Sequence, residues 1–195
     1  VLRLRKLDLS SNFRQVAMPL FAVLKEDMDA GATMNVRIDL SAPTAKTKKT
    51  GTAKPYKEGA YYKVVDTTFV DPWFGGGTRL ADGSLLQWDV TDDVVESART
   101  KRTARGKHKT KTKYRKLSTI NVTVALPHKE YAVTNLPADE GEKVKVRESE
   151  KRTTFRLAKR VKAKSIDPID PREIFDIISE AYKRVRPAVA EGSAS

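Results

Sequence analysis

The chain has 195 residues, 39% of them hydrophobic, with a formal net charge of +13 and an isoelectric point near 9.9. This length allows one domain with a sizeable core. Such a charge favours a polyanionic partner, nucleic acid or an anionic membrane surface, and the structural alternative is a solvated lysine-rich surface. Without cysteine, disulfides, thiolate metal sites and a cysteine nucleophile are excluded. The sequence shows neither an apolar run of membrane-spanning length nor a signal-peptide pattern, so we expect no membrane partner.

The N-terminal third predicts strands separated by a loop. Alternating leucines in residues 1–9 indicate a first strand with a break near Arg5–Lys6. Residues 13–24 are apolar but interrupted by a proline, which leaves an edge strand and a short helical turn both open. Residues 33–40 alternate cleanly and predict a strand with one polar face. Residues 42–59, rich in Lys, Thr, Gly and Pro, predict a flexible loop or mobile linker.

Two turn signals follow a strand predicted over residues 60–70. Gly75–Gly77 allows a phosphate-binding loop, but no Lys-Ser or Lys-Thr pair and no GxGxxG spacing accompanies it, so we favour a flexible turn. Asp82–Gly83 is typical of a tight hairpin turn before a strand from Leu85 to Val90.

Both tryptophans lie in this part of the chain. We interpret Trp73 and Trp88 as core or interface anchors, with an aromatic platform for bases as the alternative.

The segment Lys111–Leu126 organises the rest of the sequence. Its second half alternates apolar and polar side chains, which predicts a half-buried strand. The apolar set is Ile120, Val122 and Val124, and the polar set is Thr119, Asn121 and Thr123. With the preceding residues it forms a predicted long hairpin over residues 94–126, whose tip lies near Ala104–Gly106.

This hairpin is strongly basic, with ten Lys or Arg and no acid from Arg99 to Lys116. Five cations recur at every second residue, so a strand would place them on one face, roughly 6–7 Å apart, close to the phosphate spacing of one nucleic-acid strand or twice it. They are Lys107, Lys109, Lys111, Lys113 and Arg115. A bound polyanion would relieve their mutual repulsion, and a disordered, solvated tip is the alternative.

The C-terminal part predicts a loop, a strand and a helix. Residues 128–150 form a long inter-strand loop, within which VKVRE allows a short strand. Residues 151–161 alternate and predict the next strand. Residues 167–186 predict a helix capped by Asp170, followed by a loose tail over residues 187–195.

Together these elements predict a single α+β domain over residues 1–195, with an antiparallel sheet of five to seven strands. One C-terminal helix is too small to cover such a sheet. We therefore expect a homodimer in which this helix packs on the partner subunit.

Groups that carry catalysis are scarce. His108 and His128 lack metal-ligand spacing to other residues, and GxSxG is absent. Asp92–Asp93 and Asp139–Glu140 are interpreted as turn or solvated acids. We expect no catalytic residue, metal, cofactor or small-molecule substrate, and an enzyme acting on phosphorylated substrates is the weakest hypothesis.

Three segments carry a resemblance to a known family: YRKLSTINVTVALP, KRTTFRLAKRV and DPREIFDIISEAYKRV. In this order they resemble the coat proteins of small single-stranded RNA bacteriophages. The resemblance covers roughly residues 94–186 and is one of pattern. It implies a dimer with one continuous sheet facing the interior of an icosahedral capsid, where the sheet binds genomic RNA. It also implies assembly in the host cytoplasm and a place in the virion.

The resemblance implies particular RNA contacts. Thr119 and Asn121 match the family's polar RNA-facing positions, and Thr154 and Arg156 would face the same way from the following strand. This chain departs from the family in its length, its far more basic hairpin and the lack of an evident second C-terminal helix. Those departures favour general phosphate binding over recognition of one RNA hairpin. A nucleic-acid-binding module that does not assemble, using the hairpin as an arm, is the alternative.

Overall fold

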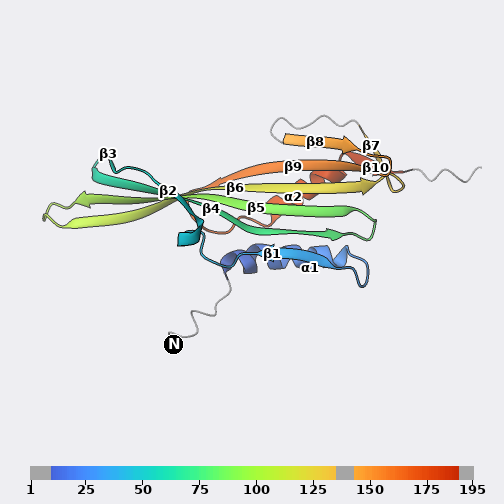
Figure 1. The fold of residues 1–195 in the computed structure, drawn as a ribbon, viewed down its shortest axis with the longest axis horizontal. Helices are drawn as coiled ribbons and strands as arrows, with labels where there is room; N and C mark the ends of the chain where they lie inside the picture. Colours follow the sequence, from blue (N-terminus) through green and yellow to red (C-terminus); the bar gives the residue numbers. More distant parts are fainter. Residues whose placement is uncertain (1–9, 135–142, 189–195) are drawn as a thin grey trace, which may run out of the picture.

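The computed structural model describes residues 10–134 and 143–188. Within them the chain forms an elongated eight-stranded antiparallel sheet with two α-helices, an α+β fold with more strands than the five to seven expected (Figure 1). The strand order is β1-β4-β5-β6-β9-β8, with β2 and β3 paired to β4. The helical segments are η2 (Phe13–Ala17), α1 (Met18–Glu26), η3 (Lys46–Lys48) and α2 (Arg172–Tyr182). The strands are β1 (Met34–Ile38), β2 (Lys49–Thr52), β3 (Tyr56–Glu58), β4 (Tyr61–Arg79), β5 (Leu85–Arg102), β6 (His108–Pro127), β7 (Tyr131–Val133), β8 (Lys143–Glu148), β9 (Arg152–Ala163) and β10 (Val185–Pro187).

The centre of the sheet is the long meander β4–β5–β6. Its two turns lie where the sequence predicts them. Gly83 and Gly106 adopt positive φ angles of 79° and 76°, and Asp82 accepts a hydrogen bond from the Ser84 amide at 2.7 Å. β5 and β6 then pair without a register shift from Leu85↔Ala125 to Arg102↔His108. The predicted long hairpin is therefore confirmed.

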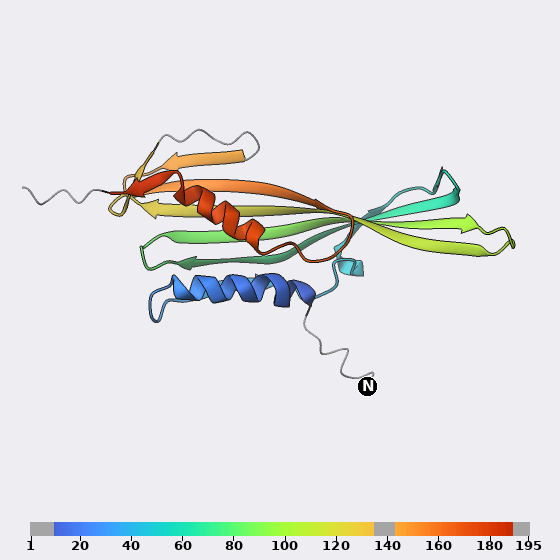
Figure 2. The same ribbon diagram turned by 180° about the vertical axis from the view of Figure 1, so that it is seen from behind.

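Both helices cover the same face of the sheet and leave the other face open (Figures 1 and 2). The buried core joins apolar side chains of α1 and α2 to one face of the central strands. It includes Val16, Leu20, Leu24, Trp73, Phe74, Leu86, Trp88, Val90, Ile120, Val122, Val124, Leu126, Phe155, Leu157, Ile174 and Ile177. The alternation predicted for β6 and β9 is thus confirmed, and both tryptophans are core residues rather than platforms for bases.

Helix α1 resolves the alternatives left open for residues 13–24. Pro19 lies in its first turn, where a missing amide N–H costs little, and η2 precedes it. Leu20 and Leu24 then face the sheet. α1 supplies the additional cover that a C-terminal helix alone could not provide.

Helix α2 is shorter than the predicted residues 167–186. Asp170 accepts a hydrogen bond from the Arg172 amide at 2.9 Å, as expected of a capping residue, but the helix ends at Tyr182. The chain continues as β10, in which Val185 pairs with Val133 of β7. Within the single chain described, α2 packs on its own sheet, whereas the sequence predicted packing on a partner subunit.

The end of α2 is tied to the β4–β5 turn by one carboxylate. Asp82 accepts hydrogen bonds from the hydroxyls of Tyr131 at 2.6 Å, Tyr182 at 3.3 Å and Ser84 at 2.8 Å. Burial raises the pKa of Asp82, but the hydrogen bonds from Tyr131 and Ser84 outweigh it and lower the pKa below its ordinary value. Burial, with the nearby Asp82 charge, raises the pKa of Tyr182 to about 12.

Two predicted loops contain strands. Residues 42–59 hold η3, β2 and β3, because Thr52 pairs with Thr67 and Tyr56 with Val64 along the edge of β4. The prediction of a mobile linker there is wrong. Residues 128–150 contain β7 and β8, and β8 confirms the short strand allowed for VKVRE. Predictions for residues 1–9, for Asp139–Glu140 and for residues 189–195 lie outside the described residues.

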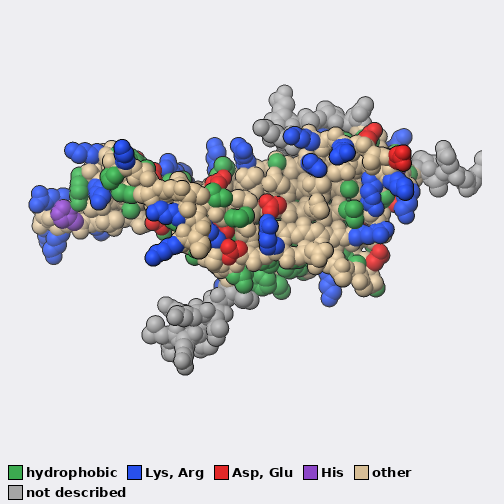
Figure 3. All heavy atoms as spheres, in the orientation of Figure 1, with side chains coloured by type: hydrophobic (Ala, Val, Ile, Leu, Met, Phe, Trp, Pro, Cys, Tyr) green, Lys and Arg blue, Asp and Glu red, His purple; other side chains and the backbone are tan. Residues whose placement is uncertain are grey.

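The meander runs past the helices as a projecting ribbon, which we call the arm. It comprises Tyr61–Thr68 of β4, Val95–Arg102 of β5 and His108–Arg115 of β6, together with β3. β9 pairs with β6 only from Lys116 to Pro127, so the β6 edge of the arm has no strand partner among the described residues. Figure 3 shows Lys and Arg side chains along the arm and over the β8–β9 end of the sheet.

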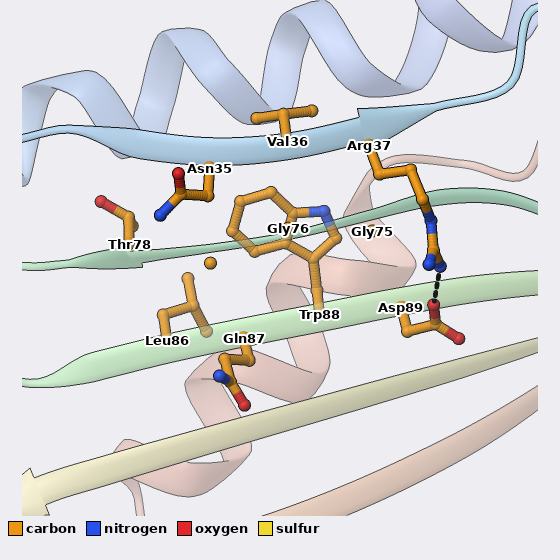
Figure 4. Close-up of a pocket in the computed structure, with 11 residues that line it drawn as sticks. Asn35, Val36, Arg37, Gly75, Gly76, Thr78, Leu86, Gln87, Trp88 and Asp89 are labelled. Atoms are coloured by element: carbon orange, nitrogen blue, oxygen red, sulfur yellow. Dashed lines mark hydrogen bonds and ion pairs between the residues drawn. The ribbon is translucent and has the colours of Figure 1, made fainter.

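Gly75–Gly77 lies in the middle of β4, so the predicted flexible turn is wrong. These glycines pair with both β1 and β5. Gly76 is required by packing, because an added Cβ would lie 2.5 Å from the Trp88 ring and 2.6 Å from the Asn35 carbonyl oxygen. Figure 4 shows the indole across Gly76 and, beside it, Arg37 reaching Asp89 at 3.1 Å.

Buried ion pairs mark the base of the arm. Asp71 and Asp92 are cross-strand partners on β4 and β5. Lys48 contacts Asp71 at 2.7 Å, and Lys116 contacts Asp92 at 3.5 Å. All four side chains are buried, so the interpretation of Asp92 as a turn or solvated acid is wrong. Burial raises the pKa of Asp71, although Lys48 opposes the shift.

Candidate nucleic-acid interface

The open face of the sheet collects the polar residues predicted from β6 and β9. Cross-strand pairing sets Thr119 opposite Arg160, Asn121 opposite Ala158, and Ala125 opposite Thr154. Because side chains alternate along a strand, all of these point away from the helices. The structure therefore brings Thr119, Asn121, Thr154 and Arg156 onto one face, as the sequence predicted.

The arm continues this face. Lys109, Lys111, Lys113 and Arg115 have the same alternation as Thr119, and no register shift interrupts the pairing of β5 with β6. Lys109 stands opposite Lys101, which increases the local positive charge, and Lys111 stands opposite Arg99, which is paired with Glu58 at 3.2 Å. The twist of the ribbon rotates the face gradually along the arm. Lys107 precedes β6 and lies in the tip turn, where its carbonyl accepts a hydrogen bond from the Thr103 amide.

Three of the arm lysines lack counter-charges. Among the carboxylates of the described residues, none lies within ion-pair distance of Lys109, Lys111 or Lys113. Arg115 contacts Asp66 at 3.3 Å but keeps 64% of its side chain exposed. Lys116, counted in the same basic run, is different, because its side chain is buried against Asp92 on the helix-covered side.

Strand β9 adds cations that the sequence analysis did not assign to the site. Arg160 and Lys162 lie on the same face as Arg156, opposite Thr119 and Leu117. The sequence KRTTFRLAKRVKA could have predicted this placement, because Arg156, Arg160 and Lys162 are separated by even numbers of residues and therefore share one face of a strand. We call the combined set the cationic track: Lys109, Lys111, Lys113 and Arg115 of β6, with Arg156, Arg160 and Lys162 of β9.

Lys145 and Arg147 of β8 border the track, opposite Arg156 and Thr154. The acids on the open face lie mainly on the other side, on β5. Asp89 is held by Arg37 and Asp93 is exposed. The positive charge is therefore concentrated on the β6, β9 and β8 side.

The length of the track limits what it can bind. From Lys109 to Thr123, the partner of Arg156, the strand advances by fourteen residues, about 46 Å at the usual rise. No small molecule contacts residues so far apart at once. An extended polyanion does.

The histidines have local partners. His108 Nδ1 lies 2.7 Å from the Tyr62 hydroxyl in the arm, and His128 Nε2 lies 2.9 Å from Thr153 Oγ1. Among the described residues, no group of three or more His, Asp or Glu side chains is arranged to hold a metal ion. Likewise, no helix in the described ranges is long and apolar enough to cross a membrane.

Comparison with known proteins identifies no relative: no family model, no curated protein and no solved structure matches this chain.

Proposed function

We propose that this protein binds single-stranded RNA along the cationic track and acts as a self-assembling viral coat protein. The observation that carries the proposal is the continuity of the track. Lys109, Lys111 and Lys113, which have no carboxylate of the described residues within ion-pair distance, share one face with the basic and polar residues of β6 and β9. Evenly spaced cations on an extended strand suit phosphates and carry little sequence information, which fits packaging of a genome without reading it.

The two-sided architecture supports the coat role. One face of the sheet is covered by α1 and α2, and the opposite face carries the track. A shell built from such subunits would turn the basic face toward the enclosed RNA and the helices outward, as in the phage coat proteins that the sequence resembles. Self-association into dimers and then into an icosahedral particle, assembled in the host cytoplasm, is part of this proposal.

Negative-stain microscopy of the purified protein, with its absorbance ratio at 260 and 280 nm, tests the assembly role. We expect uniform closed particles that contain nucleic acid. Small species that bind RNA but never close into particles would contradict the coat role and leave RNA binding intact.

A second candidate is an RNA-binding module that does not assemble. The arm favours it, because the arm projects beyond the helices and its β6 edge pairs with no other strand of the described residues, as expected of an element that inserts into a nucleic-acid partner. Size-exclusion chromatography separates the two candidates. The module elutes as a monomer or dimer at every protein concentration, whereas the coat protein forms large particles.

A further inference from the structure

A hollow of about 530 Å³ lies on the open face where the arm leaves the sheet. Its volume falls within the range of roughly 300–1,000 Å³ that small-ligand pockets occupy. It exists because β9 ends at Ala163 while β6 continues into the arm, so that the sheet loses one strand at this point.

The floor of this junction hollow is apolar. Val95 of β5 and Leu117 of β6 line it, and both are half-buried on the helix-free side. Leu117 stands opposite Asp93 on one neighbouring strand and opposite Lys162 on the other. Covering apolar side chains on the outer face of a sheet with a flat, poorly hydrated group is favourable, because it removes apolar surface from water.

The rim of the junction hollow is cationic. Arg115, Lys162 and Lys164 surround it, and Asp93 is the one acid among the lining residues. Neighbouring strands lie about 4.8 Å apart. Lys162 is the cross-strand partner of Leu117, and Arg115 is the cross-strand partner of Val95, so both cations lie within one side-chain length of the floor. The surface therefore joins apolar contact to phosphate-binding charge at the spacing of one nucleotide.

We propose that the junction hollow takes one unstacked base of a bound RNA strand, which gives the protein a preference for single-stranded over duplex RNA. This inference rests on the proposed RNA-binding function and adds the form of RNA that the same surface selects. The base lies on Val95 and Leu117, and its flanking phosphates meet Arg115 and Lys162. A duplex keeps its bases paired and stacked, so no base face is free to lie on Val95 and Leu117.

The test is fluorescence anisotropy with three labelled ligands of equal length: a single-stranded RNA, the same strand with abasic sites, and a duplex. The principal variant is Leu117→Thr, which removes apolar contact but suits a strand. Val95→Thr is a second variant that is nearly isosteric. The matched control is Leu85→Thr, because Leu85 is an exposed leucine on the same face of β5, outside the hollow and the track.

We expect the unaltered protein to bind the base-bearing strand about fivefold more tightly than the abasic strand, near the low end of what one base contact contributes. Leu117→Thr and Val95→Thr should reduce that ratio toward one and leave the affinity for the abasic strand unchanged. Leu85→Thr should preserve the ratio.

An unaltered ratio in both Leu117→Thr and Val95→Thr would overturn the junction hollow as a base site. If RNA binding then still falls on removal of the arm lysines, the proposed function stands without it. Absence of binding to all three ligands by the unaltered protein would overturn the proposed function itself.

Discussion

The two halves of strand β6 have opposite surroundings although they belong to one uninterrupted strand. From Ile120 to Leu126, the large apolar side chains are buried under the helices while Asn121 and Thr123 face outward. From His108 to Arg115, no helix within residues 10–134 and 143–188 covers either face, and most side chains are exposed. Register and hydrogen bonding with β5 are the same throughout.

The strand pairing is the same in both halves, so the helix cover decides which residues of β6 stabilise the fold and which are free to bind a partner. Apolar burial in the covered half stabilises the folded state. The arm buries little and holds charge that destabilises it unless a polyanion is bound. Substitutions should therefore lower stability in the covered half and lower affinity in the arm.

The largest effect is expected at the boundary between the two halves. Lys116→Ala leaves the buried carboxylate of Asp92 without its cation and should lower the free energy of unfolding by about 3–5 kcal/mol. Lys113→Ala, the exposed control three residues into the arm, should change it by less than about 0.5 kcal/mol. Urea denaturation measures both. Similar losses of stability in the two variants would contradict a boundary at Lys116 between the stabilising half of β6 and the arm.

The next effect concerns the helix cover. Ile177→Ala should cost about 2–4 kcal/mol, because Ile177 is fully buried between α2 and the sheet. Val146→Ala on β8, whose side chain is exposed, should cost less than about 0.5 kcal/mol. Because α2 packs on its own sheet, the loss in Ile177→Ala should not depend on protein concentration. A concentration-dependent loss would place the helix on a partner subunit.

A smaller effect is expected at Asp82, which ties α2 to the β4–β5 turn. Asp82→Asn should lower stability by about 1–3 kcal/mol at neutral pH. The pKa of Asp82 is lowered in the folded state, so its stabilisation is complete above its ordinary value of 3.8 and is lost as pH falls through the lower folded value. Denaturation curves across this acidic range should show a shallower acid limb in Asp82→Asn.

The matched control for this prediction is Asp89→Asn. Asp89 forms an exposed ion pair with Arg37, and such pairs contribute about 0–1 kcal/mol. Its acid limb should match that of the unaltered protein. Identical acid limbs in all three proteins would show that Asp82 has no stabilising role.

The alternation of apolar residues predicted much of the fold. In β6 and β9 the alternation correctly predicted which side chains are buried, and therefore also that Thr119, Asn121 and Arg156 face outward. Periodicity succeeds here because one face of each strand is buried and the other is solvated. The turns at Gly83 and Gly106 were predictable because each requires a positive φ angle.

The failures have tertiary causes. Gly75–Gly77 has the composition of a turn, but only glycine fits at position 76, because the ring of Trp88, twelve residues later, lies across it. Lys116 has the same residue type as its exposed neighbours, and only the buried Asp92 distinguishes it. Residues 42–59 lack periodicity because β2 and β3 are short edge strands with most side chains exposed. These features depend on contacts between distant parts of the chain, so a local sequence pattern does not predict them.

The most direct test of the central claim is the salt dependence of single-stranded RNA binding. Lys109, Lys111 and Lys113 are replaced together by Gln. The control replaces Lys25, Lys129 and Lys183, which are exposed, lie off the open face and change the net charge equally. The slope of log K against log salt should fall by about two units in the arm variant, at roughly 0.7 per lost contact, and stay unchanged in the control. Equal slopes in both variants would show that net charge, rather than the arm, governs binding.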